Sequence, residues 1–319
     1  MPSVHRGPRA FSLPEGLSGV LRRLLDQRAK RLDKRLNTAI GVVAAVGVSG
    51  ATVWAWRAGE LALAELSWWP LAVALLVTAP ASLALKSAEY QLAARIASQK
   101  PSTTRSFRVA AVSSAANLLP LPGSLIVTVR SLSEDGSTYG SAISAGAVPG
   151  LCWLSITGIV GGSAIAVEGP PWLGAVTAIA GVSAGVGALK LFKETAPGGG
   201  STRLALAVLG VEAMWLIISA LRLGLAVTAL GVDVSPGQAL ALSVAGALTV
   251  AIGFFPSGLG LREALIAGLS PLIGLELDVG VLIGSVDRLV WLTFLAAASG
   301  VLVLFGSGSG KSPLSEADR

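Results

Sequence analysis

The sequence predicts an all-helical, polytopic membrane protein with about six spanning helices and two re-entrant broken-helix hairpins arranged as an inverted repeat. The first observation is composition: 53% of the 319 residues are apolar, only 13% are charged, and the mean hydropathy is +0.72. A soluble domain carries about 25% charged residues, and a soluble fold of this length cannot bury so much apolar surface. The second observation is a series of apolar stretches as long as a bilayer is thick. The third is that two of these stretches are broken near the middle by proline and glycine.

The N-terminal 36 residues contain nine basic and three acidic residues, and so carry the whole net charge of +6. Over residues 16–36, leucines recur at helical spacing opposite arginines and lysines, which predicts an amphipathic helix lying in the headgroup layer. Its expected partner is anionic lipid, not nucleic acid. We therefore divide the chain into a basic cytosolic leader (1–36), a membrane transport domain (37–305) and a flexible cytosolic tail (306–319).

Six uninterrupted stretches are long and apolar enough to span a bilayer, which takes about 20 residues. They are Thr38–Trp56, Trp69–Leu85, Tyr139–Val167, Trp172–Leu191, Leu204–Leu230 and Val279–Phe305.

Two further stretches, Val109–Leu132 and Ala239–Leu269, are interrupted in the middle. Proline removes a backbone donor and clashes with the preceding turn, and glycine permits a tight reversal, so each stretch is expected to form two helices joined at a break. The residues that predict the breaks are Pro120, Pro122 and Gly123 in the first stretch and Pro256, Gly258 and Gly260 in the second.

Charge distribution predicts how the broken stretches sit in the cytoplasmic membrane. With the basic leader and the C-terminal tail in the cytosol, both ends of Val109–Leu132 fall on the cytosolic side and both ends of Ala239–Leu269 on the outer side. The two stretches are then hairpins that enter from opposite faces, an arrangement that builds a site near the bilayer midplane. The alternative is that each stretch is a pair of short spans or one kinked span.

Several kinds of site are excluded by residue counts. The single cysteine, Cys152, excludes an intramolecular disulfide and a cysteine-based metal cluster. The single histidine, His5, lies in the leader, which excludes histidine-based catalysis or metal binding within the membrane. Residues 306–312 (GSGSGKS) lack the glycine that a phosphate-binding loop requires at position 305. We expect no catalytic residue, no metal and no cofactor.

The candidate site consists of charged residues at membrane depth, where each costs about 2.5–3.5 kcal/mol at the centre of a span. Arg130 follows the first break, Arg262 and Glu263 follow the second, and Asp287 and Arg288 lie about one-third into the last span. Helix N-termini at a mid-membrane break attract phosphate, and an arginine adds a bidentate donor. We predict that Arg130 and Arg262 hold an anionic headgroup, one from each half, while the other three residues tune the charge.

Other interpretations stay open for these residues. Arg262–Asp287 and Glu263–Arg288 are alternatively structural ion pairs that lock the second hairpin. Asn117 is expected to bond backbone groups freed by the first break, and it is also a candidate for substrate contact. Glu212 and Arg222 are weaker candidates. We interpret them as structural, because both lie on one helix, and a single helix does not bring side chains together from several directions. The glycine pairs Gly158–Gly162 and Gly181–Gly185 indicate close helix packing.

At the two breaks the sequence resembles the transmembrane region of the lysylphosphatidylglycerol synthase/flippase family. Residues 256–263 (PSGLGLRE) are similar to that family's Pro-x-Gly-Leu-Gly-Val-Arg-Glu signature, and Arg288 matches an arginine in a following helix. The first element, from Asn117 to Arg130, is similar to the family's Asn…Pro-Gly-Arg-Leu-Gly-Glu-x-x-Arg, but Val127 replaces its glutamate. The resemblance covers residues 38–305 and implies a stand-alone flippase-type domain. Lysyl-lipid synthesis is not expected, since no synthase domain follows.

The leading functional hypothesis is therefore a lipid translocase that moves a phospholipid or lipid-linked headgroup through a polar cavity at the midplane. The expected partner is a membrane lipid as substrate, and the sequence leaves open whether the chain forms a homo-oligomer. One alternative is a membrane enzyme acting on a polyprenyl or lipid phosphate, with Glu134/Asp135 or Glu263/Asp287 as its acids. The other is a structural membrane subunit that transports nothing.

Overall fold

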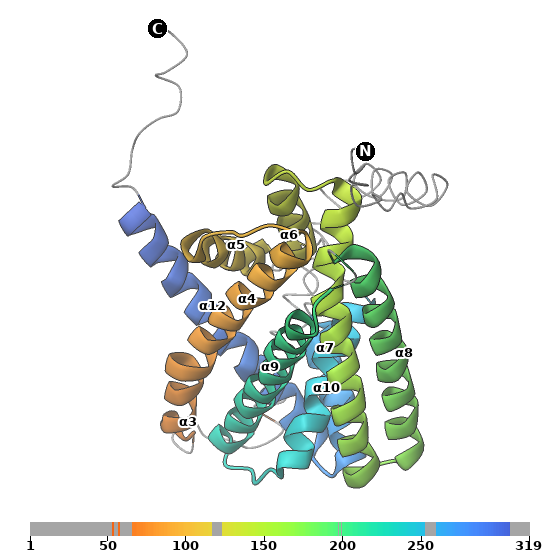
Figure 1. The fold of residues 1–319 in the computed structure, drawn as a ribbon. Coiled ribbons are helices and arrows are strands. Elements are labelled where there is room, and N and C mark those ends of the chain that lie inside the picture. The colour runs from red at the N-terminus through yellow and green to blue at the C-terminus, as the bar shows by residue number, and fades with distance from the viewer. Residues whose placement is uncertain are drawn as a thin grey trace, which may run out of the picture.

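In the computed structural model, the described residues are 53, 57, 66–116, 123–196, 198, 200–252 and 260–306, and among them every regular element is helical (Figure 1). This confirms the predicted all-α class. A π-helical turn (η2) interrupts the first long helix, and η5 is a 3₁₀ turn. In chain order the elements are α3 (Trp68–Val73), η2 (Ala74–Thr78), α4 (Ala79–Ile96), α5 (Thr103–Ala116), α6 (Gly123–Glu134), α7 (Tyr139–Glu168), α8 (Pro171–Thr195), α9 (Thr202–Ala229), α10 (Pro236–Ile252), α11 (Leu261–Leu269), η5 (Ser270–Ile273) and α12 (Leu277–Gly306).

Within the described part of the chain, five helices are long and apolar enough to cross a membrane, each having 22 to 30 residues. The chain is thus a helical, multi-pass membrane protein by the length and composition of its helices. These segments overlap five of the six predicted spans; the sixth, Thr38–Trp56, lies outside the described residues, as do the leader and the tail. The five are Trp68–Ile96, Tyr139–Glu168, Pro171–Thr195, Thr202–Ala229 and Leu277–Ala298.

Both interrupted stretches form two helices, as predicted. α5 ends at Ala116 and α6 begins at Gly123, while α10 ends at Ile252 and α11 begins at Leu261. Gly260 precedes α11 with a φ of +81°, a conformation that residues with a Cβ rarely adopt. The other break residues, Pro120, Pro122, Pro256 and Gly258, lie outside the described residues, and so does Asn117.

The two ends of each interrupted stretch lie next to each other. In the first, Arg105 Nη2 near the start of α5 lies 2.7 Å from Asp135 Oδ1 just after α6. In the second, Gln238 Nε2 near the start of α10 donates to the carbonyl oxygen of Ile273 in η5 at 2.8 Å. Each stretch is therefore a helical hairpin whose two ends return to the same end of the bundle.

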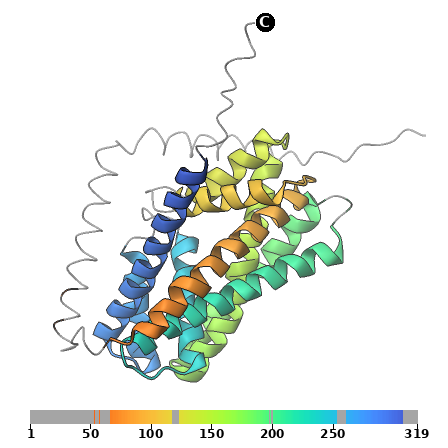
Figure 2. The same cartoon turned by 90° about the vertical axis from the view of Figure 1, so that its left-hand side faces the viewer.

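The two hairpins lie at opposite ends of α7. The 30-residue α7 is about 45 Å long, and four residues separate its start from the end of α6, beside the first hairpin. At its other end, the Glu168 carboxylate accepts a hydrogen bond of 2.7 Å from Ser235 Oγ, directly before α10. Figures 1 and 2 show α5 lying across the end of α4, while the turn between α9 and α10 lies at the far end.

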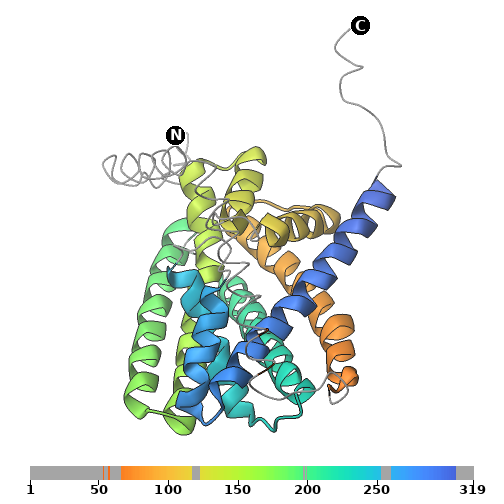
Figure 3. The same ribbon diagram turned by 180° about the vertical axis from the view of Figure 1, so that it is seen from behind.

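α12 packs against the helices that carry the polar side chains described below. It contacts α11, α9 and α4, and in Figure 3, viewed from behind, it runs diagonally across the bundle. α4 is reached through the π turn at Ala74–Thr78, where Pro80 has no N–H to offer to the carbonyl of residue 76. Ser82 follows one turn later and faces α9 across this packed interface.

Glycines set the contact between α7 and α8. A Cβ added at Gly158 would lie 2.7 Å from the Cα of Gly181, and one added at Gly162 would lie 2.7 Å from the backbone nitrogen of Ala178. Backbone therefore touches backbone, as the small-residue spacing predicted. The outer side of α8 exposes apolar side chains such as Ile179 and Val186, which is the surface that lipid requires.

We expect Gly158→Ala to destabilise the α7–α8 contact by about 1–3 kcal/mol, because the added methyl group meets backbone that cannot move aside. The matched control is Gly150→Ala in the same helix, where a Cβ meets nothing within 4 Å. Thermal unfolding of the detergent-solubilised protein measures both. Equal midpoints for the two variants would contradict the close contact.

Candidate functional site: a charge cluster between three helices

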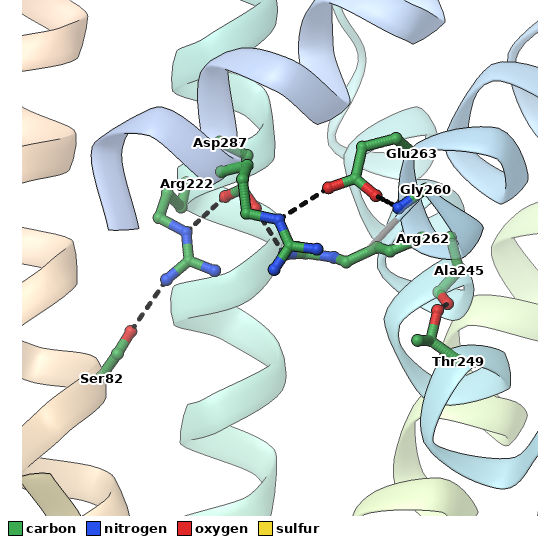
Figure 4. A network of polar contacts seen from close by, with 9 residues as sticks. Ser82, Arg222, Ala245, Thr249, Gly260, Arg262, Glu263 and Asp287 are labelled. Carbon is green, nitrogen blue, oxygen red and sulfur yellow. Dashed lines mark hydrogen bonds and ion pairs between the residues drawn. The ribbon is translucent and has the colours of Figure 1, made fainter. Parts of the chain in front are cut away.

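Five charged side chains from three helices meet inside the bundle. They are Arg222 from α9, Arg262 and Glu263 from α11, and Asp287 and Arg288 from α12, and we call them the charge cluster. Figure 4 shows two neighbouring series of polar contacts: one runs from Ser82 on α4 through Arg222 and Asp287 to Arg262, and the other joins Arg288, Glu263 and Gly260. The sequence separates these residues by up to 206 positions, so tertiary packing alone brings them together.

Asp287 is the centre of the cluster. Its side chain is completely buried, and its two oxygens face different arginines: Oδ1 accepts from Arg222 Nε, and Oδ2 lies 2.6 Å from Arg262 Nη1. Arg222 is held further by a 3.3 Å bond from Nη1 to Ser82 Oγ and by the ring of Trp291, 5.5 Å from its guanidinium carbon. One carboxylate thus ties α9, α11 and α12 together.

Glu263 links the start of α11 to α12. Its Oε1 accepts from Arg288 Nε at 2.8 Å, and its Oε2 accepts from the backbone N–H of Gly260 at 3.0 Å. The second bond satisfies a donor that the break leaves free, and a negative charge is favourable at a helix N-terminus. α12 approaches closely here because it has glycine at 284: a Cβ there would lie 3.1 Å from the Cα of Glu263.

The cluster lies well inside the apolar part of the bundle. Arg222 is seven residues from the end of α9, about 10 Å along the helix, and Asp287 is ten residues from the start of α12, about 15 Å. Both distances are measured from the same end of the bundle: α10 begins soon after α9 ends, and Gln238 near its start bonds the carbonyl oxygen of Ile273, four residues before α12. The hydrocarbon core of a bilayer is about 30 Å thick, so this depth corresponds to between one-third and one-half of it.

The charges of the cluster do not cancel. Three arginines stand against two carboxylates, which leaves one positive charge in excess among the described residues that form it. Arg288 and Glu263 form one pair, and Arg222 and Arg262 share Asp287. Of the five side chains Arg262 is the most accessible, at 23% exposed, against 0–12% for the others.

Two buried donors, one in the charge cluster and one beside it, have no acceptor among the described residues. They are Nη2 of Arg288 and Nε1 of Trp153 on α7. A Cβ added at Gly246 of α10 would lie 3.7 Å from the Trp153 ring and 3.9 Å from Arg262 Nε, so both side chains flank that glycine. A buried donor costs free energy until it meets an acceptor. The arrangement therefore favours a ligand rich in acceptor oxygens.

Arg130 does not join the cluster. Its side chain is 80% exposed and pairs with Glu134 one turn along the same helix at 2.9 Å. The expected convergence of Arg130 and Arg262 is therefore not found, because α6 turns Arg130 toward the outside of the bundle. Asn117 lies outside the described residues, so its contacts are not described.

From the sequence, Arg222 is interpreted as a structural residue, together with Glu212. In the structure, Arg222 belongs to the charge cluster. The signal was present, since an arginine in the middle of an apolar span is costly without a partner. The sequence alone does not show which way α9 turns this side chain. It also does not show that the partner of this side chain is Asp287, 65 positions later on α12. Both ion pairs considered as structural locks, Arg262–Asp287 and Glu263–Arg288, are formed.

The acids considered for an enzyme are all engaged by arginines. Glu134 pairs with Arg130 and Asp135 with Arg105, while Glu263 and Asp287 belong to the cluster. In the part of the chain that the structure describes, no three His, Cys, Asp or Glu side chains gather as metal ligands would.

The chain matches no protein-family model and no curated protein. The resemblance to the lysylphosphatidylglycerol synthase/flippase family thus rests on its two motifs and stays a prediction.

We expect Asp287→Asn to destabilise the protein by about 3–5 kcal/mol, because it leaves Arg222 and Arg262 without their shared counter-charge in a buried position. Glu276→Gln, an exposed change one residue before α12, is the control and should leave stability unchanged. Thermal unfolding in detergent checks both. An Asp287→Asn protein as stable as the control would show that the shared carboxylate does not hold the helices together.

Proposed function

We propose that the protein is a lipid translocase of the flippase type, which moves a lipid bearing an anionic phosphate between the leaflets of the cell membrane. In this proposal Arg262 contacts the phosphate, and the remaining four charged residues of the cluster hold the helices in position. The headgroup passes between the helices at the depth of the cluster while the acyl chains stay in lipid. The protein acts without a catalytic residue.

The observation that carries the proposal is the excess positive charge. Two arginines would balance the two carboxylates; a third, at membrane depth, is costly unless an anion accompanies it. A phosphate supplies that charge together with several acceptor oxygens, and an arginine fork binds it bidentately. The unpartnered donors of Trp153 and Arg288 add to the same preference.

The hairpin geometry supports an inverted repeat. Each hairpin has its two ends together, the two lie at opposite ends of α7, and the N-terminus of α11 lies at the cluster. Discontinuous helices of this kind build transport sites in the middle of membranes. We propose that both hairpins are re-entrant, the first from the cytosol and the second from outside.

The distribution of side chains supports cytosolic termini in the cell membrane. Exposed tryptophans (Trp68, Trp69 and Trp172) and exposed acids (Asp233 and Glu276) gather where the second hairpin begins and ends. Aromatic belts mark a membrane boundary, and basic loops face the cytosol. At the end of the first hairpin lie exposed basic residues, namely Arg105, Arg108, Lys190, Lys193 and Arg203.

A purely structural role explains both ion pairs but not the third arginine. A lock needs equal numbers of opposite charges, and burying an uncompensated ion costs several kcal/mol. The two roles therefore predict opposite results when the extra charge is removed. The motif at residues 256–263, which resembles that of a flippase-type family, includes Arg262, the most accessible of the three arginines.

We expect Arg262→Gln to keep the protein folded while weakening its binding of anionic phospholipid about tenfold or more. The cluster then consists of two balanced pairs, Arg222–Asp287 and Arg288–Glu263, and has lost a charge-assisted hydrogen bond worth about 1.5–3 kcal/mol. Native mass spectrometry with phosphatidylglycerol measures the binding, and thermal unfolding measures the stability. Lys190→Gln, which removes an exposed positive charge from α8, is the matched control.

Transport itself is tested in reconstituted vesicles, by the accessibility of a fluorescent headgroup to a membrane-impermeant quencher. The wild type and Lys190→Gln should transfer the lipid, and Arg262→Gln should not. An Arg262→Gln protein that unfolds more easily but transfers lipid at the wild-type rate would overturn the proposal in favour of a structural lock.

A further inference from the structure

Glu212 is a second buried charge, separate from the cluster. It lies in α9, ten residues before Arg222, so the two are about 15 Å apart along the helix. The residue is 3% exposed, and its Oε1 has no hydrogen-bond partner among the described residues. Because α4 and α7 both pack on α9, the carboxyl group lies within protein and away from lipid.

Three titratable side chains lie near Glu212. Lys86 and Glu89 come from α4 and act on the ionised carboxylate in opposite directions, and the thiol of Cys152 comes from α7. Lys86 Nζ already lies 2.7 Å and 2.8 Å from the two oxygens of Glu89, so these two residues form a neutral pair.

Among the other described elements that pack on α9, none brings a counter-charge. α10, α3 and η2 contain no titratable residue, and on α12 Asp287 and Arg288 are committed to the charge cluster. An ionised Glu212 would therefore be a buried negative charge without a local partner, which costs several kcal/mol. A proton on the carboxyl group removes this cost.

The ion pair nearest to Glu212 is partly accessible at the surface of the protein. Lys86 and Glu89 are 21% and 19% exposed. On the other side, Arg222 and its bond to Ser82 lie in the same α4–α9 interface. Glu212 thus stands between a partly exposed ion pair and the charge cluster.

We propose that Glu212 is a proton-binding site and that its proton accompanies the anionic headgroup. The inference rests on the proposed function, and its physical basis is charge balance. With the cluster empty, its excess positive charge favours ionised Glu212; with a phosphate bound, that charge is neutralised and the protonated acid is favoured. Headgroup and proton then favour each other's binding, and the linkage is reciprocal.

The size of the linkage follows from Coulomb's law. One unit charge removed at about 15 Å, with an effective dielectric constant of about 20, changes the affinity on the order of fivefold. Acidic conditions, which protonate Glu212, should therefore strengthen binding of an anionic lipid, and alkaline conditions should weaken it by the same factor.

The test measures binding of phosphatidylglycerol to the full chain from mildly acidic to mildly alkaline pH, since its phosphodiester stays ionised throughout. The wild type should bind about fivefold more tightly at the acidic end. Glu212→Gln mimics the protonated acid and should bind tightly at both ends. Glu194→Gln, an exposed change on α8, should keep the wild-type pH dependence.

Infrared difference spectroscopy on the same samples reports the proton directly. The wild type and Glu194→Gln should show the carbonyl band of a buried carboxylic acid, shifted in D₂O and lost at alkaline pH, and Glu212→Gln should lack it. The wild-type measurement stands even if the variant does not fold.

The outcomes separate this inference from the proposed function. Anionic lipid that binds without pH dependence, or a pH dependence that Glu212→Gln retains, overturns the proton site while the translocase proposal stands. An infrared band that matches Glu212, with no preference for anionic over neutral lipid at any pH, overturns both the proposed function and the coupling. Absence of the band overturns the proton site alone.

Discussion

The shared carboxylate of Asp287 is the interaction on which the interior of this protein depends. In hydrocarbon there is no water to stabilise an unpaired charge, so each arginine that enters the bundle must find an acceptor within it. Asp287 serves two of them, from α9 and α11, and is itself on α12. The position of the second hairpin relative to the spanning helices is thereby set by electrostatics, whereas the contact between α7 and α8 is made by glycines.

The same constraint explains the contrast between the two hairpins. At the second, the acid of α11 caps its own helix and binds α12, so the break is anchored to charges at depth. At the first, the described charges pair near the end of the bundle, where Arg105 meets Asp135 and Arg130 meets Glu134, partly exposed. The backbones of the two hairpins are thus arranged alike, but among the described residues their charged side chains make different contacts.

Most of the helical layout could be predicted because the bilayer imposes it. Apolar length determines which helices are long enough to span, and proline and glycine determine where the two broken stretches divide. The depth of Arg262, Glu263, Asp287 and Arg288 also follows from counting residues. The candidate site was less predictable: Arg130 was expected in it and lies outside, whereas Arg222 was set aside and lies within.

The sequence by itself determined a helical membrane protein with two broken hairpins and several charges too deep to be solvated. Only the tertiary structure decided which of those charges meet, and that an odd arginine remains after pairing. The reason is that composition and periodicity describe one helix at a time. The rotation of a helix about its own axis, which turns Arg222 inward and Arg130 outward, is determined by what packs against it.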